Sequence, residues 1–224
     1  ADTNISEPLT ELAGWAPDQK MNDCQSVRTD VVIAGAGPVG LVLALELGIR
    51  GVRCILLNDQ PTTAHHPKAN AVSSRTMEHL RRLGVAKRLR MCGLDDNHPT
   101  DVSYFTRLTG YEIGRLRQPS RAEAMQRARD GNGDWASPEP PHRVSQIFLE
   151  SELKRRVDEI SAIEARFGWR LDEFTDRGDH VSAHAHQSGS DGELVIEAEF
   201  LIGCDGANSI VRKTLGIEYE GDSG

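Results

Sequence analysis

This chain contains few cysteines and fewer basic than acidic residues. Its 224 residues include four cysteines, none in a C-x-x-C pair, and Cys54 and Cys204 lie in apolar runs. We therefore expect buried free thiols, which suit a reducing, cytoplasmic compartment. The net charge of −8 argues against a nucleic-acid binder and is typical of an ordinary soluble enzyme.

Signal sequences and membrane-spanning runs are also missing. The N-terminus has no basic-then-apolar stretch, and residues 1–28 predict a polar extension. Residues 31–49 hold few polar side chains, but Glu46, Pro38 and the three glycines at 35, 37 and 40 argue against a spanning helix there. A buried parallel strand followed by a buried helix explains the same apolarity. We expect neither a membrane nor a nucleic acid among the partners.

The most informative stretch is GAGPVG at residues 35–40, which follows a short apolar strand at 31–33. A buried helix is predicted at 41–49 and a second strand at 54–57. The glycines therefore lie in a βαβ unit of about 30 residues, the context in which G-x-G-x-x-G binds a dinucleotide. A glycine-rich turn without a ligand is the alternative.

Each glycine of this stretch has an expected role. Gly35 allows the turn out of the strand, Gly37 lets a pyrophosphate approach the backbone, and Gly40 allows close packing of helix on strand. The first helical turn, with Pro38 and Val39, presents N–H groups and the positive end of the helix dipole to phosphates.

The end of the second predicted strand departs from the dinucleotide-binding pattern. An acidic residue is expected there to bind a ribose, but the position holds Asn58, followed by Asp59. Asn58 could bind a ribose hydroxyl through its amide, and Asp59 could serve instead if the strand ends one residue later. Alternatively, the two residues simply begin a turn.

Residues 60–72 predict a loop, and a helix is expected from Ser73 or Ser74 to Gly84. The pair His65-His66 has no matching ligands, so we expect a solvated loop and no metal. Lys68 could reach phosphates from this loop. Arg75, in the first helical turn, is a candidate cofactor contact.

The middle of the chain predicts mixed structure. Residues 101–117 favour two strands, and residues 118–141 a long polar loop. A helix with apolar residues at 149, 153, 157 and 160 is expected after Gln146, followed by a strand at 167–174. A further strand at 181–186 places two histidines on one face, which we interpret as solvated because no third metal ligand is evident.

Residues 194–216 repeat the strand–turn–helix arrangement. A strand ending at Ile202 leads into Gly203-Cys204-Asp205-Gly206, and a helix follows. Asp205 is well placed to bind ribose hydroxyls, and Arg212 could reach a pyrophosphate by a charge-assisted bond. An ordinary turn with a capping aspartate is the alternative.

Four sequence blocks resemble the class A flavoprotein aromatic hydroxylases, the para-hydroxybenzoate hydroxylase-like group. The blocks are GAGPVG at 35–40, PKANAVSSRTMEHLRRLGV at 67–85, HRVSQIFLESELKRR at 142–156 and CDGANSIVRKTLG at 204–216. Within this group the chain looks closest to the phenol, chlorophenol and 3-hydroxyphenylpropionate hydroxylases.

The resemblance implies an α/β fold: a Rossmann-like FAD-binding domain of the glutathione-reductase type with an additional β-rich insertion. It would cover residues 29–224, with residues 94–145 and 167–200 including the start of a substrate-side sheet. The implied FAD contacts, some shared with NAD(P)H, are Gly35, Gly37, Pro38, Val39, Gly40, Asn58, Asp59, Lys68, Asn70, Arg75, Gln146, Asp205, Gly206 and Arg212.

The resemblance also implies an activity. NADH or NADPH would reduce FAD, O₂ would add at C4a, and the C4a-hydroperoxyflavin would transfer one oxygen to a phenolic substrate. No residue shows itself as the catalytic base. The family carries a further Gly-Asp motif and a substrate domain, so we expect an N-terminal portion that forms a homodimer or pairs with a C-terminal portion.

Two alternatives stay open. One is a related flavin oxidoreductase, such as a halogenase or a prenyl-chain reductase, although the blocks at 67–85 and 142–156 argue against it. The other is a non-catalytic module that binds FAD or another nucleotide.

Overall fold

The computed structural model describes residues 25–66, 68–131 and 137–221. Most of the extension predicted at residues 1–28 therefore lies outside the described residues. The main body is a six-stranded sheet with the strand order β7-β2-β1-β10-β9-β8. Its parallel strands are β7 (Ile163–Phe167), β2 (Cys54–Asn58), β1 (Gln25–Ala34) and β10 (Glu193–Gly203). Two antiparallel strands extend it, β9 (Val181–Gln187) and β8 (Trp169–Asp176).

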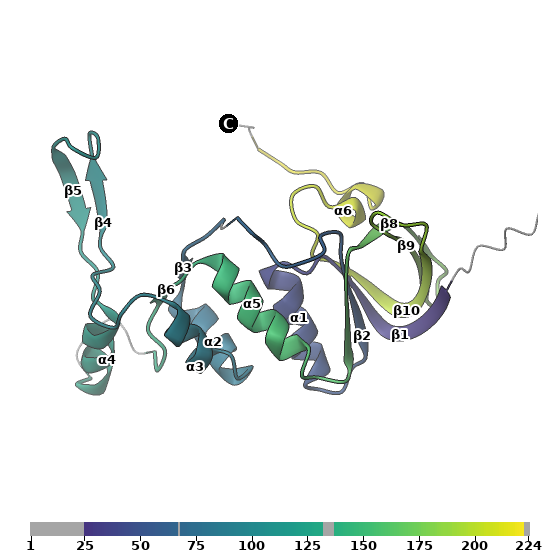
Figure 1. Cartoon of the computed structure of the whole chain (residues 1–224), viewed down its shortest axis with the longest axis horizontal. Helices are drawn as coiled ribbons and strands as arrows, with labels where there is room; N and C mark the ends of the chain where they lie inside the picture. Colours follow the sequence, from purple (N-terminus) through teal and green to yellow (C-terminus); the bar gives the residue numbers. More distant parts are fainter. Residues whose placement is uncertain (1–24, 67, 132–136, 222–224) are drawn as a thin grey trace, which may run out of the picture.

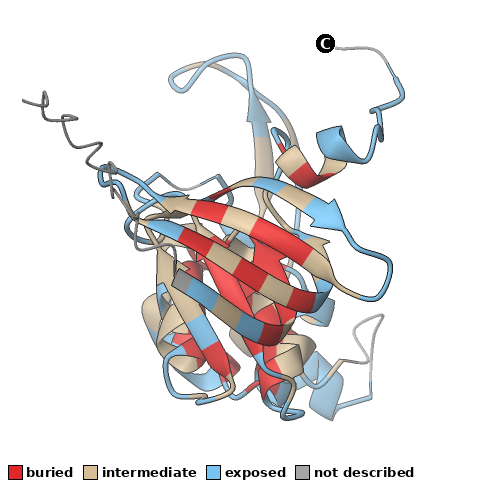
Figure 2. Ribbon diagram, turned by 90° about the vertical axis from the view of Figure 1, so that its right-hand side faces the viewer, coloured by how far each residue is buried: buried red, intermediate tan, exposed pale blue. Residues whose placement is uncertain are grey.

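The apolar runs of the sequence explain why β1 and β2 lie at the centre of the sheet. Val32 and Ile33 of β1 and Leu56 of β2 are fully buried. Strands covered on both faces need such continuous apolar runs. Ile33 pairs with Leu56 on one side and with Ile202 of β10 on the other. Buried residues follow the strands of the sheet in Figure 2.

Two helices cover one face of this sheet, α1 (Pro38–Gly48) and α5 (Gln146–Val157) (Figure 1). Leu41 and Leu45 of α1 and Leu153 of α5 are fully buried and belong to one hydrophobic cluster. Burying each of these leucines stabilises the fold by about 1.5–3 kcal/mol. On the opposite face a second cluster includes Val211 of the short helix α6 (Ile210–Thr214).

The predicted helix after residue 72 is confirmed. It is α2 (Ser74–Arg82), with Ser73 accepting the N–H of Thr76 as its N-cap. Met77 and Leu80 are buried, and α3 (Ala86–Cys92) follows directly. Two short strands flank this region and pair with each other, β3 (Ala71–Val72) and β6 (His142–Arg143).

The two strands predicted within 101–117 form a hairpin, β4 (Val102–Phe105) with β5 (Glu112–Leu116), which projects from the body (Figure 1). The long loop predicted at 118–141 is wrong in part, because it contains α4 (Arg121–Arg129). Ser120 accepts the N–H of Glu123 at 3.2 Å, and the Glu123 carboxylate accepts the N–H of Ser120 at 2.8 Å. This capping box starts the helix.

The strand predicted at 167–174 is confirmed for residues 169–174, which lie in β8, but residue 167 ends β7, and Gly168 separates the two strands. This glycine has a φ of +76°, a conformation that favours glycine. Between residues 167 and 200 the chain forms β8, β9 and most of β10, which all belong to the six-stranded sheet. Among the described helices, none combines the length and apolarity that a membrane crossing requires.

Candidate functional site

A cavity of about 580 Å³ opens at the carboxyl ends of β1, β2 and β10. Ligands of open α/β sheets bind at this edge, where crossover connections leave a crevice. The cavity joins segments that are far apart in the sequence: the turn at 34–39, the loop at 57–68, the start of α5 and the turn at 204–210.

Most of the predicted cofactor contacts meet in this cavity. Those that line it are Gly35, Gly37, Pro38, Val39, Asn58, Asp59, Lys68, Gln146, Asp205 and Gly206. The sequence predictions therefore converge on one place, although the residues span 172 positions of the chain from Gly35 to Gly206.

The three glycines of the first turn differ in what surrounds them. A Cβ at Gly35 would lie 2.4 Å from the carbonyl oxygen of Cys204, and one at Gly40 would lie 1.9 Å from the carbonyl oxygen of Gly35. These two glycines are required by the packing of the protein itself. A Cβ at Gly37 would meet no protein atom within 4 Å. Gly37 thus leaves open space on the cavity side, the feature expected where a ligand approaches the backbone.

The N-terminus of α1 is built to receive an anion. Gly37 is its N-cap and makes no side-chain capping bond, and the first turn holds no acidic residue. The free N–H groups of this turn and the helix dipole therefore face the cavity without competition from a protein carboxylate.

The side chain of Asn58 makes hydrogen bonds to the backbone of two loops beside the cavity. Its Oδ1 accepts the N–H of Ala36 at 3.4 Å, and its Nδ2 donates to the carbonyl oxygen of Gln60 at 3.1 Å. The amide therefore ties the glycine turn to the loop after β2. The neighbouring carboxylate of Asp59 lines the cavity, is exposed and has no partner among the described residues.

The two carboxylate oxygens of Asp205 differ in their hydrogen bonding. Its Oδ2 accepts the N–H of Ile210, the first residue of α6, at 2.7 Å. Its Oδ1 is buried and has no hydrogen-bond partner within the described part of the chain. A buried acceptor without a partner is costly, and a ligand hydroxyl or N–H would satisfy it. The capping alternative therefore accounts for only one of the two oxygens.

A buried carboxylate in the cavity wall, Glu150, escaped the sequence analysis. Its Oε1 accepts from Nε2 of Gln146 at 2.6 Å, and its Oε2 accepts the N–H of Ala64 at 2.8 Å. Glu150 is 3% exposed, so it joins α5 to the loop that carries Lys68. The available signal was its i, i+4 spacing from Gln146 on one helix face. Other unpredicted lining residues include Gln60, Thr62, Thr63, Trp169, Arg170 and Asn208.

Three predicted contacts do not line the cavity, and each has partners elsewhere. Arg75 pairs with Glu78 at 2.9 Å and is highly exposed. Asn70 accepts from Arg143 at 3.4 Å. Arg212 donates to the carbonyl oxygen of Ile217 at 2.6 Å, with its guanidinium 4.4 Å from the ring centroid of Tyr219.

Gly40 also does not line the cavity, since it packs beneath the glycine turn. The histidines set aside in the sequence do not line the cavity: His65 contacts Thr62 at 2.9 Å, and His186 contacts Asp172. No cluster of three or more metal-ligating side chains occurs among the residues described.

A glycine turn, a free helix N-terminus and a strand-end carboxylate around one cavity define a dinucleotide-binding domain. The sequence profile of the FAD binding domain family matches residues 28–224. The chain belongs to this family, and the predicted resemblance to the class A flavoprotein hydroxylases is confirmed.

Relatives and solved structures agree with this assignment. FAD-dependent monooxygenase apdD of Emericella nidulans is 35% identical over 192 residues, covering 85% of this chain and 31% of that protein. The 2,4-dichlorophenol 6-monooxygenase of Cupriavidus pinatubonensis is 30% identical, covering 89% and 32%. The flavin-dependent monooxygenase PieE, solved in complex with FAD and substrate, matches with a TM-score of 0.76 and 29% identity, covering 88% and 33%. This chain spans about a third of the length of these proteins.

Proposed function

We propose that this chain is the FAD-binding portion of a monooxygenase that hydroxylates a phenolic aromatic ring, using NADH or NADPH and O₂. One observation carries the cofactor assignment. The open side of Gly37 and the unpartnered Oδ1 of Asp205 line the same cavity. That cavity offers backbone donors for phosphates and a buried acceptor for a hydroxyl, the two kinds of group that FAD presents together.

The residues present fit FAD. The N–H groups around Gly37 and Val39 would hold the pyrophosphate, and Lys68 would add a positive charge beside it. Asp205 would accept from a sugar or ribityl hydroxyl through its free oxygen. Asp59 would bind the adenosine ribose, because the amide of Asn58 is already engaged by the backbone at 36 and 60.

FAD supplies the electron and oxygen transfer when it is bound. The protein binds, orients and protects it. The buried Glu150 holds Gln146 and the loop at 60–68 against the cavity. Burial raises the pKa of the Cys204 thiol, and the Asp205 carboxylate raises it further. The thiol therefore stays neutral.

The phenolic substrate is proposed from the relatives' names. The 2,4-dichlorophenol 6-monooxygenase and the phenol 2-monooxygenase of Pseudomonas sp., 29% identical to this chain, are both named for phenols. The substrate pocket would involve the remaining length of a protein of that size, since this chain covers 32% and 35% of these two relatives.

The test is turnover by the full-length protein loaded with FAD. NADH or NADPH oxidation is measured with and without a panel of phenols, and the product is analysed by mass. We expect phenol-stimulated oxidation and a product heavier by one oxygen atom. A halogenated product, or oxidation that no phenol stimulates, would contradict the proposed hydroxylase.

A further inference from the structure

A second cavity, of about 730 Å³, lies between the α2–α3 pair and α4. It shares no lining residue with the FAD cavity. We call it the α3–α4 cleft. Its walls carry five cationic side chains, although the whole chain has a net charge of −8. These are Arg81, Lys87, Arg90, Arg121 and Arg129.

Protein carboxylates neutralise only part of this charge. The cleft is lined by two of them, Asp96 and Glu139. Asp96 pairs with Arg121, and Glu139 accepts from Arg90 at 2.6 Å and also lies 3.8 Å from Arg81. Within the described residues, neither Lys87 nor Arg129 has an ion-pair partner. The cleft therefore retains an excess of positive charge.

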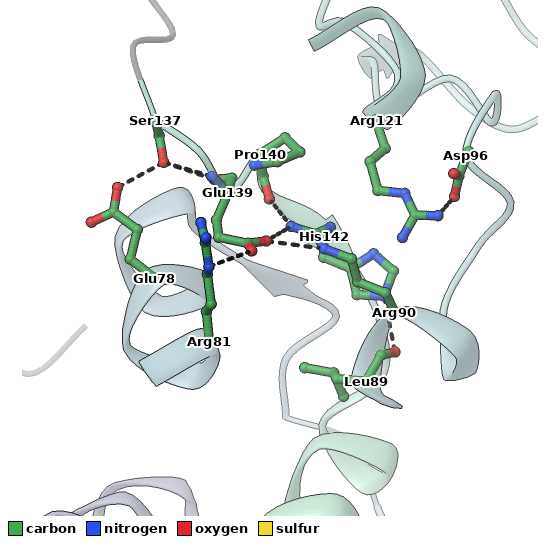
Figure 3. A network of polar contacts seen from close by, with 10 residues as sticks. All are labelled: Glu78, Arg81, Leu89, Arg90, Asp96, Arg121, Ser137, Glu139, Pro140 and His142. Atoms are coloured by element: carbon green, nitrogen blue, oxygen red, sulfur yellow. Dashed lines mark hydrogen bonds and ion pairs between the residues drawn. The ribbon is translucent and has the colours of Figure 1, made fainter. Parts of the chain in front are cut away.

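Arg90 is the most buried cation of the cleft. Its side chain is 15% exposed, and it donates to Glu139 and, at 2.7 Å, to the carbonyl oxygen of Pro140 (Figure 3). Its Nη1 is buried and has no hydrogen-bond partner among the described residues. A guanidinium has five N–H donors, so part of this one is left unsatisfied. An acceptor in the cleft would complete it.

Arg121 lies close enough to Arg90 for the two charges to oppose each other. Burial lowers the pKa of Arg121, and the positive charge of Arg90 lowers it further, whereas the carboxylates of Asp95 and Glu139 act in the opposite direction. Figure 3 shows the Arg121 side chain extending from its helix toward the Arg90 and His142 side chains. Two guanidinium groups on separate elements, with side chains only 15% and 20% exposed, thus line one cleft, an arrangement that suits a doubly charged oxyanion.

From this juxtaposition we propose that the α3–α4 cleft binds a phosphate dianion, either free or as part of a phosphorylated small molecule. Arg90 and Arg121 are its direct ligands, and Lys87 and Arg129 supply long-range attraction at the rim. The bound anion satisfies Nη1 of Arg90 and relieves the repulsion between the two guanidinium groups. This site is separate from the FAD cavity and does not depend on the proposed reaction.

The test is calorimetric titration of the FAD-loaded full-length protein at fixed ionic strength. Inorganic phosphate and 2′,5′-ADP are titrated separately. We expect saturable binding of at least one of them that weakens as salt rises. Tighter binding of 2′,5′-ADP identifies a phosphorylated nucleotide as the source, and equal or tighter binding of inorganic phosphate identifies the free ion. Absence of saturable binding by both would overturn the proposal.

Two variants locate the binding. Arg121→Gln should weaken it by about tenfold or more, as expected for losing a charged hydrogen-bond donor. Lys87→Ala, an exposed position that is safe for folding, should weaken it less. The matched control is Arg88→Gln. Arg88 lies on α3 next to Lys87, but it pairs with Glu152 at 2.9 Å and does not line the cleft. All three variants should retain FAD. Binding that is unchanged in both Arg121→Gln and Lys87→Ala would overturn the proposed site.

Discussion

Replacing Gly37 with alanine should separate the stability of the domain from its affinity for FAD. The backbone at Gly37 has a φ of −73° and a ψ of −175°, which alanine adopts without strain, and a Cβ there would meet no protein atom within 4 Å. Gly-to-Ala changes at compatible positions stabilise proteins by about 0.4–1 kcal/mol. The FAD-free variant should therefore melt at or slightly above the temperature of the unmodified protein.

FAD affinity should fall in the same variant. The new methyl group would occupy the approach of the pyrophosphate to the helix N-terminus, so one or two charged hydrogen bonds would be lost, at about 1.5–3 kcal/mol each. This corresponds to an increase in Kd of about tenfold to more than a hundredfold. FAD binding is measured by quenching of flavin fluorescence in the full-length protein, and stability by thermal unfolding without FAD.

A matched control is Gly114→Ala, because a Cβ there also meets no atom within 4 Å but lies in the β4–β5 hairpin, outside the cavity. It should leave the affinity for FAD unchanged, and its melting temperature without FAD should equal or slightly exceed that of the unmodified protein, as for Gly37→Ala. Gly40→Ala is a poor substitute, since its Cβ would lie 1.9 Å from a backbone oxygen and would disturb the fold. Unchanged FAD affinity in Gly37→Ala would refute the assigned role of this glycine.

Three further predictions follow from the cavity wall and the core. Asp205→Asn should raise the Kd for FAD by about tenfold, because a charged acceptor is lost, while circular dichroism stays unchanged; equal affinity would show that the free oxygen does not contact FAD. Glu150→Ala should lower the free energy of unfolding by about 1–3 kcal/mol, since it leaves two donors unpaired, and should speed tryptic cleavage after Lys68. A cleavage rate equal to that of Glu152→Ala would contradict the loop-holding role. Burial raises the pKa of the Cys54 thiol to about 11, so alkylation of Cys54 in the native protein should need a higher pH than in the denatured chain. Alkylation is followed by peptide mass analysis, and the same dependence on pH in the native and the denatured chain would contradict the raised pKa of Cys54.

Local sequence patterns predicted the elements that build the site. The apolar runs at β1 and β2 and the spaced glycines between them specify a βαβ unit without long-range information. The apolar spacing of α2 and its serine cap predicted that helix equally well. α4 was missed although Ser120 and Glu123 form a capping box, a local signal that the polar composition of the segment concealed.

Side-chain partners could not be predicted in the same way, because they depend on residues brought close by folding. Arg212 was expected at the pyrophosphate but contacts the segment at 217–219. Glu150 was overlooked because a glutamate on a helix normally faces solvent, whereas its partner at Ala64 lies 86 positions away. The distinct roles of Gly37 and Gly40 likewise emerge only from their surroundings.

The proposed function depends most directly on FAD binding by the full-length protein. Its visible absorption spectrum should be recorded after gentle purification, and the small molecule released on denaturation should be identified by mass. We predict flavin absorption bands and the mass of FAD. A colourless full-length protein that also fails to take up added FAD would contradict the central claim.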